Sequence, residues 1–198
     1  MENEYEESLD YQIKKKLLFD LGANYTTYNP TVYYPKKKIA PSEIDNYFRN
    51  DIIRGSVHDM GAAMQGGVGG HAGLFSNSND VAKIMQMYLQ GGYYGGKRFF
   101  SSSTIDNFNT CYYCNDGNRR GLGFDKPQLD DSSPTCGCVP MSSFGHSGFT
   151  GTYVWADPEN KIVYVFLSNR TFPTMENKML STYNIRTEIQ RVIYESFK

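Results

Sequence analysis

The sequence has no long hydrophobic run and no large excess of charge of either sign. No apolar stretch approaches the roughly 20 residues that cross a bilayer, and the acidic start MENEYEESLD is unlike a signal peptide. The formal net charge of the 198 residues is −1 and the pI is about 6.3. A balanced charge argues against electrostatic binding to nucleic acid or to anionic lipid. We therefore expect no nucleic-acid partner and no membrane span.

Histidine and cysteine are both scarce, which restricts metal chemistry. The histidines are His58, His71 and His146. They lack the H-E-x-x-H spacing and the clustered carboxylates of a metal hydrolase. The cysteines form one C-x-x-C pair and one C-x-C pair, namely Cys111, Cys114, Cys136 and Cys138. Four thiolates could bind a structural zinc ion; otherwise they are loop thiols, or form one disulfide if the protein works in an oxidising compartment. We favour the second interpretation and expect no metal and no cofactor.

Apolar residues recur at helical spacing in three segments. The first helix is predicted over residues 4–22 and the second over 81–89, where Ser76–Asn79 offers an N-cap. The third is predicted near the C-terminus, with an apolar stripe made of Leu180, Ile185, Ile189, Val192, Ile193 and Phe197. We also expect a short helix near 103–109 and a strand around 121–124. Seven glycines between residues 55 and 73 indicate tight turns, but they do not form a phosphate-binding loop.

A β-hairpin is predicted between these helices. Residues 153–155 precede the turn-forming sequence Asp157-Pro158-Glu159-Asn160, and the following run 162–167 is wholly apolar, β-branched or aromatic. Such a run is typical of a strand that is buried on both faces. We therefore expect an α/β fold of the α+β type, in which an antiparallel β-sheet is flanked by helices. The C-terminal helix should cover one face and further helices the other.

Two long segments carry a resemblance to a known family. FGHSGFTGTYVWADPENKIVYVFLSNR (144–170) and GGVGGHAGLFSNSNDVAKIMQMYLQGGYYGGKRF (66–99) resemble the serine β-lactamase and penicillin-binding-protein family. The resemblance is to its class C and esterase-like branch, and to the β-lactamase-like domains found with family 3 glycoside hydrolases. It covers the chain from about residue 17 onward. It implies a partial β-lactamase/transpeptidase-like fold and an acyl-enzyme that hydrolyses a β-lactam, a D-amino-acid peptide or an ester.

The resemblance implies a set of site residues on one strand. The family's third motif, Lys-Thr-Gly or His-x-Gly, lies on the strand that walls the active site, and His146, Ser147 and Gly148 match it. The substrate would touch main chain at Gly148, where no Cβ intervenes. The backbone N–H of Phe149 would donate to the oxyanion. His146 would supply a cation or a hydrogen bond, although a histidine before a glycine turn also serves as an ordinary hydrogen-bond partner.

Two further residues are candidates for substrate contact. They are Gly151, just after the motif, and His71 in the glycine-rich segment. For His58 and His71 an alternative is that they hold the glycine-rich loop by hydrogen bonds. Peptidoglycan-like or small-molecule substrates fit this family, and the resemblance implies a periplasmic or cell-envelope location.

The family's nucleophile motif is absent from the 198 residues. No serine is followed three residues later by lysine, and Tyr113-Cys114-Asn115 matches the family's Tyr-x-Asn only in letters because it comes too late. We expect residues 1–198 to be the C-terminal portion of a single β-lactamase-like domain that lacks the N-terminal helix, the first strands and the Ser-x-x-Lys region. Such a portion should not hydrolyse substrate alone. The strand at 161–168 would be left at an open edge, which favours a homodimer. The alternative function is a non-catalytic module that binds peptidoglycan or a partner.

Overall fold

The structure, a computed structural model, describes residues 6–127 and 134–197. They form two compact units. The first comprises Met1–Asp80 and Ser168–Lys178, and the second comprises Val81–Leu167 and Met179–Lys198. In the described part of the chain, every helix is too short or too polar to span a bilayer.

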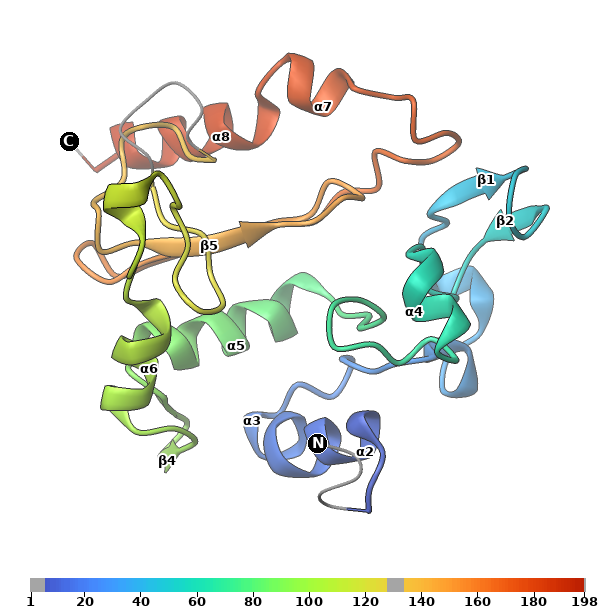
Figure 1. Cartoon of the computed structure of the whole chain (residues 1–198), viewed down its shortest axis with the longest axis horizontal. Coiled ribbons are helices and arrows are strands. Elements are labelled where there is room, and N and C mark those ends of the chain that lie inside the picture. The colour runs from blue at the N-terminus through green and yellow to red at the C-terminus, as the bar shows by residue number, and fades with distance from the viewer. Residues whose placement is uncertain (1–5, 128–133, 198) are drawn as a thin grey trace. The chain divides into compact units, whose positions relative to one another are not determined.

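The first unit begins with one continuous helical segment, drawn in dark blue in Figure 1. It consists of α2 (Leu9–Ile13), the π-helical η1 (Lys14–Leu18) and α3 (Phe19–Leu21). Gly22 ends it with a left-handed φ of 67°. The predicted helix is confirmed from Leu9 onward, whereas Glu4 and Tyr5 lie outside the described residues. The buried positions include Gln12, which an apolar stripe does not predict, and its Nε2 donates to the Glu7 carbonyl at 2.8 Å.

Short elements complete the first unit. They are η2 (Pro30–Val32), η3 (Lys36–Lys38), β1 (Glu43–Asp45), β2 (Asp51–Ile53) and α4 (Met60–Met64). Strands β1 and β2 pair antiparallel. The Glu43 carboxylate, 2% exposed, accepts hydrogen bonds from the Tyr47 hydroxyl (2.9 Å) and the Met175 N–H (3.1 Å). The β1–β2 hairpin is thus bonded to residues 168–178, the later stretch of chain that belongs to the first unit.

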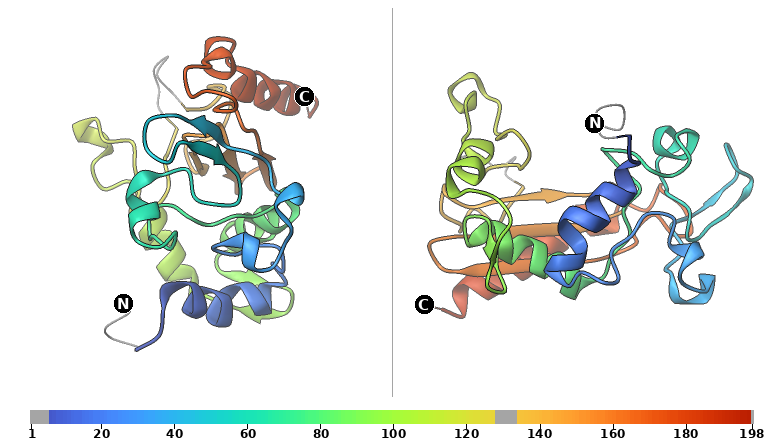
Figure 2. Two further views of the ribbon diagram at one scale, coloured as in Figure 1. Left: turned by 90° about the vertical axis from the view of Figure 1, so that its right-hand side faces the viewer. Right: turned by 90° about the horizontal axis from the view of Figure 1, so that it is seen from below.

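The second unit is built on a three-stranded antiparallel sheet in the order β5-β6-β7. Its elements are β5 (Phe144–Ser147), β6 (Tyr153–Asp157), β7 (Ile162–Phe166), the hairpin β3 (Tyr93–Tyr94) and β4 (Lys97–Arg98), α5 (Ser78–Leu89, which begins in the first unit), α6 (Ser102–Asn109), η4 (Cys114–Asp116), α7 (Met179–Thr182) and α8 (Ile185–Glu195). The predicted helices at 81–89 and 103–109 and the predicted hairpin are confirmed. The strands run side by side in the right-hand view of Figure 2.

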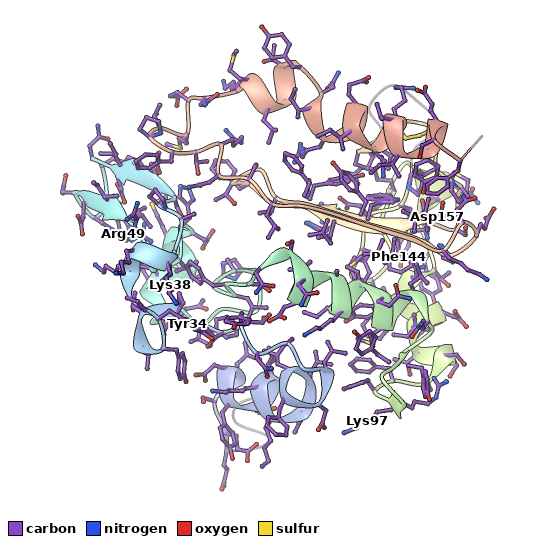
Figure 3. The ribbon with its side chains drawn as sticks, turned by 180° about the vertical axis from the view of Figure 1, so that it is seen from behind. Tyr34, Lys38, Arg49, Lys97, Phe144 and Asp157 are labelled. Atoms are coloured by element: carbon purple, nitrogen blue, oxygen red, sulfur yellow. A yellow bond between two sulfur atoms is a disulfide. The ribbon has the colours of Figure 1, made fainter. Side chains whose placement is uncertain are left out.

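Helices cover both faces of this sheet, as Figure 1 shows for α5 and α8. Side chains alternate along β6, as they must in a strand. Tyr153 and Trp155 pack with Ile193 of α8 on one face. On the other face Ala156 and Phe144 pack with Met85 of α5, and Figure 3 labels Phe144 there. The predicted α+β architecture, a sheet with the C-terminal helix on one face and another helix opposite, is confirmed.

Two details of the predicted sheet are wrong. Strand β7 is half-buried, with only Tyr164 below 9% exposure, because among the described residues it pairs with β6 alone and forms an edge. Residues 121–124 form a turn instead of a strand. The Gly121 N–H donates to the Phe124 carbonyl at 2.9 Å, so the chain reverses there.

The predicted apolar stripe on the C-terminal helix is wrong for most of its members, although Ile193 packs on the sheet as expected. Its members Ile185, Ile189 and Val192 are 38%, 39% and 65% exposed, and α8 buries Gln190 and Tyr194 instead. Both buried side chains have a hydrogen-bonded oxygen, which lowers the cost of burial, although Gln190 Nε2 has no hydrogen-bond partner among the described residues. The Tyr194 hydroxyl donates to Asp157 Oδ2 (2.5 Å), and Gln190 Oε1 accepts from the Cys136 N–H (3.0 Å).

Candidate functional site

Strand β5 begins at the centre of the second unit and ends at its surface. Gly145 is buried, and a Cβ there would lie 2.2 Å from Cε3 of Trp155 and 2.1 Å from the Val154 carbonyl oxygen. The lack of bulk at this position is therefore required by packing. From His146 onward the strand becomes exposed, so the predicted motif residues lie on accessible main chain.

The His146 side chain is exposed and has a defined orientation. Its Nδ1 lies 2.8 Å from the Ser147 carbonyl oxygen and donates to it. When the ring is neutral, this donation leaves Nε2 as the nitrogen with a free lone pair. In register, His146 lies opposite Val154 of β6. The imidazole can thus offer Nε2 as a base, or as a second donor once it is protonated.

A tight turn follows the motif. The Gly148 N–H donates to the Thr152 carbonyl (2.8 Å), and the Gly151 N–H donates to the Gly148 carbonyl (3.0 Å). Gly151 is buried with a φ of 102°, which favours glycine. A Cβ at Gly148 would lie 2.2 Å from Thr152 Oγ1, so this glycine also has a local packing reason. Phe149, at the tip, is 61% exposed.

The outer edge of β5 is partly covered by Asp125. Its N–H and carbonyl exchange hydrogen bonds with Gly145 at 2.8 and 3.1 Å. The buried Asp125 carboxylate lies 2.9 Å from Arg119 and 2.9 Å from Arg120, in two ion pairs that lack aligned hydrogen bonds at Asp125 Oδ1 and Arg119 Nη1. The pairing with Asp125 stops at Gly145 and does not extend along His146 and Ser147.

Lys126, which the sequence did not point to, is a buried amine beside this edge. It is 6% exposed, and Nζ donates to the Ser142 carbonyl (3.0 Å) and to Asn109 Oδ1 (3.3 Å). Burial lowers the pKa of the Lys126 ammonium to about 8. No spacing pattern marks a single lysine of this kind, so only the three-dimensional structure reveals it.

The predicted contact His71 belongs to the first unit. Its Nε2 lies 3.0 Å from Asp59 Oδ1. Asp59 also caps α4 by accepting the Ala62 N–H at 2.8 Å. This N–H, followed by His71, holds the pKa of the Asp59 carboxyl below its usual value. His58 likewise bonds Glu43 Oε2 at 2.9 Å, so both histidines hold their loops by hydrogen bonds. His146, Ser147, Gly148, Phe149 and Gly151 come together in one hairpin of the other unit.

The four cysteines form two disulfides, Cys111–Cys114 and Cys136–Cys138. The sequence predicted loop thiols or one disulfide, and two disulfides form instead. All four sulfurs are therefore paired with one another, and the described residues contain no group of three or more His, Cys, Asp or Glu that is placed to hold a metal ion.

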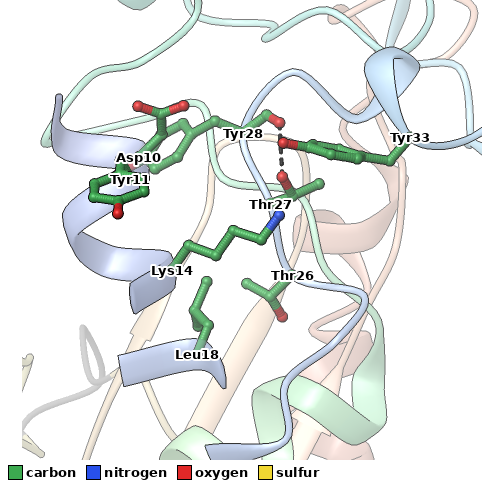
Figure 4. Close-up of a pocket in the computed structure, with 8 residues that line it drawn as sticks. All are labelled: Asp10, Tyr11, Lys14, Leu18, Thr26, Thr27, Tyr28 and Tyr33. Carbon is green, nitrogen blue, oxygen red and sulfur yellow. Dashed lines mark hydrogen bonds between the residues drawn. The ribbon is translucent and has the colours of Figure 1, made fainter. Parts of the chain in front are cut away.

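A pocket of about 210 Å³ lies in the first unit, and Figure 4 shows its walls. It is lined by Asp10, Tyr11, Lys14, Leu18, Thr26, Thr27, Tyr28 and Tyr33. Lys14 Nζ lies 4.5 Å from the centre of the Tyr33 ring, and the Thr27 hydroxyl donates to the Tyr28 carbonyl. None of the predicted site residues lines this pocket.

Comparison with known proteins gives consistent matches. A family model described as "Beta-lactamase" matches residues 8–187. Two curated proteins named "Putative D-alanyl-D-alanine carboxypeptidase", from Escherichia coli K12 and Salmonella enteritidis PT4, are 34% and 32% identical over 82% and 85% of this chain. The chain spans only 40% and 42% of their lengths.

Two solved structures share the fold. A β-lactamase from Mycobacterium bovis has a TM-score of 0.57 and 17% identity over 92% of this chain and 59% of its own. A penicillin-binding-protein homologue from Caulobacter crescentus has a TM-score of 0.53 and 15% identity over 82% of this chain and 47% of its own.

Proposed function

Since the chain belongs to the β-lactamase family, we propose that it is the C-terminal portion of a single hydrolase domain that works through an acyl-enzyme. The N-terminal helix, the first strands and the nucleophile would lie outside these 198 residues. The absence of any Ser-x-x-Lys in the chain supports this division, and so does the share of the curated relatives that it spans.

The observation that carries the proposal is the exposed end of an edge strand at His146–Phe149. A substrate with an amide or ester carbonyl can lie along main chain at this point, where pairing with Asp125 has ended. In the proposal His146 Nε2 assists the polar group or the proton transfer. The Phe149 N–H donates to the oxyanion. Gly151 shapes the turn beside the substrate, and His71 is a further substrate contact.

We propose a D-amino-acid peptide as the preferred substrate class, ahead of a β-lactam or an ester. The names of the curated relatives favour it. A histidine in the motif's lysine position favours a peptidase or esterase over an antibiotic-resistance enzyme. A cell-envelope location, periplasmic where the cell has a periplasm, follows from a peptidoglycan-like substrate.

The test compares the 198-residue chain with the protein from the complete reading frame. The purified chain should not turn over a chromogenic cephalosporin or an activated ester. The longer protein, if it contains Ser-x-x-Lys, should be acylated by a fluorescent penicillin. His146→Ala should slow acylation by about 100-fold or more, and His146→Lys should retain most of the rate because it restores the family's commoner residue. Turnover by the 198-residue chain, or full activity of His146→Ala, would contradict the proposal.

A non-catalytic module that binds peptidoglycan or a partner is the second candidate, and the complete reading frame decides between the two functions. A complete reading frame without Ser-x-x-Lys, whose product sediments with peptidoglycan but resists acylation, would establish this function instead.

We also propose that the isolated chain forms a homodimer. Strand β7 pairs only with β6 among the described residues, and α8 exposes Ile185, Ile189 and Val192. Open strand edges and apolar stripes both favour self-association. Light scattering should give twice the chain mass, and a monomer at high concentration would refute this expectation.

A further inference from the structure

The two disulfides differ in what they can contribute to the fold. Each closes a very small loop, since the paired cysteines are three and two positions apart. A disulfide stabilises chiefly by restraining the unfolded chain, and the effect is smallest for the shortest loops. Global stability is therefore a weak reason for either bond, and local surroundings have to explain them.

Those surroundings are opposite in character. Cys114 is exposed and follows Tyr112 and Tyr113, which are 52% and 60% exposed. Cys136 is 7% exposed, and its N–H is bonded to the buried Gln190. Thiol–disulfide exchange requires a thiolate to reach a sulfur atom. An external thiol can reach the exposed Cys114, whereas in the other pair Cys136 is shielded and Cys138 is half-buried.

The two sulfurs of the exposed pair also differ. Cys111 Sγ lies 3.2 Å from the Asn118 carbonyl oxygen. In the disulfide this sulfur carries no hydrogen, but after reduction the Cys111 thiol can donate to that carbonyl. Cys114 is exposed whereas Cys111 is only half-exposed, so Cys114 Sγ is the sulfur that an external thiolate reaches, and after reduction it is the sulfur that an external disulfide reaches.

We propose that Cys111–Cys114 is a reversible thiol–disulfide exchange site that takes a protein dithiol of the thioredoxin class. One thiolate of the dithiol attacks Cys114 Sγ, and the bond to Cys111 breaks. Cys111 leaves as a thiolate and takes a proton from water. The second thiolate of the dithiol attacks its own mixed disulfide, which releases Cys114 and leaves the dithiol oxidised. Two electrons pass to the chain, and no other oxidant or reductant is needed.

The segment that follows this disulfide in the sequence contacts strand β5. After Asn118 come Arg119 and Arg120, both 2.9 Å from the Asp125 carboxylate. Asp125 in turn bonds Gly145 at 2.8 and 3.1 Å. Opening the disulfide loosens the segment that anchors the two arginines. We therefore expect the Gly145 amide to exchange its hydrogen faster in the reduced chain, whether or not the chain is part of a hydrolase.

The experiment uses the intact chain equilibrated with oxidised glutathione and then exposed to dithiothreitol or to thioredoxin. Samples are quenched with acid and alkylated, and each cysteine pair is quantified by peptide mass spectrometry. Cys111–Cys114 should open at least about tenfold faster than Cys136–Cys138 in native buffer. In concentrated guanidinium chloride the two rates should converge, because shielding is lost.

Several results would overturn the proposal. They are equal native rates, faster opening of Cys136–Cys138, resistance of both pairs, or free thiols at 111 and 114 after oxidation. The link to β5 has its own readout. The double variant Cys111→Ser/Cys114→Ser should show the same faster exchange of the Gly145 amide as the reduced chain. The matched Cys136→Ser/Cys138→Ser variant should show no selective increase in exchange at Gly145. Unchanged Gly145 exchange in the reduced chain would refute the link.

Discussion

Replacing Gly145 with alanine tests why strand β5 starts with so little bulk. The new Cβ would lie 2.1 Å from the Val154 carbonyl oxygen and 2.2 Å from Trp155 Cε3, although ordinary contacts of a Cβ begin near 3.4 Å. Trp155 cannot easily move aside. It is 1% exposed, its ring stacks on Tyr153 at 5.7 Å, and its Nε1–H donates to Ser143 Oγ at 2.9 Å.

The expected cost follows from these contacts. Overpacking a rigid site costs about 3 kcal/mol, and losing a glycine from the unfolded chain returns up to about 1 kcal/mol. We expect Gly145→Ala to lower the free energy of unfolding by about 2 kcal/mol. Gly123→Ala is the matched control, because no atom lies within 4 Å of its added Cβ. It should change stability by less than about 0.5 kcal/mol.

The assay is urea unfolding followed by the fluorescence of Trp155, which is the only tryptophan in the sequence and is buried in the sheet. The midpoint of Gly145→Ala should fall at an unchanged slope. If the midpoints of Gly145→Ala and Gly123→Ala coincide, the packing explanation is wrong and the glycine has another role.

Three further substitutions test other contacts. The folded pKa of Lys126 is about 8, so the unfolded chain binds this proton more tightly than the folded chain, and wild-type stability increases with pH. Between about pH 7.5 and 9.5 the free energy of unfolding of the wild type should rise by about 1–2 kcal/mol, measured by urea titration at both pH values. In Lys126→Met this rise should be absent. An equal rise in both proteins would exclude Lys126 as its source. Tyr194→Phe should cost about 1–3 kcal/mol because it leaves the buried Asp157 without its 2.5 Å donor, and Tyr183→Phe, at an exposed site, should be neutral in the same denaturation assay. Asp59→Ala should cost about 0.5–1 kcal/mol at neutral pH through loss of the α4 cap; because the folded pKa of Asp59 is lowered, this difference should shrink as the pH falls through that pKa, and a constant difference down to acid pH would contradict the assignment.

The sequence predicts the fold best where the pattern is local. The turn Asp157-Pro158-Glu159-Asn160 and the apolar run after it specify the β6–β7 hairpin, and Gly22 marks the end of the first helix. The buried face of α8 could not be read in this way. Gln190 and Tyr194 are buried because Cys136 and Asp157, both distant in sequence, supply their hydrogen bonds. Helical periodicity carries no information about such partners.

Only part of the candidate site could likewise be predicted from the sequence. The motif at His146 predicts a strand at this position, and β5 with its exposed end agrees with that prediction. The role of Gly145 depends on Trp155 across the sheet, and the coverage of the edge depends on Asp125 and its two arginines. These pairings are non-local contacts between loops and strands. No residue spacing reports them.

The most direct test of the account is a titration of the isotope-labelled chain with an acyl-D-alanyl-D-alanine peptide, followed by backbone amide NMR. We expect saturable shifts at His146, Ser147, Phe149 and Gly151, with the Gly123 amide unaffected. A peptide that leaves residues 144–151 unperturbed, or that shifts amides only elsewhere, would contradict the claim that the end of β5 receives substrate.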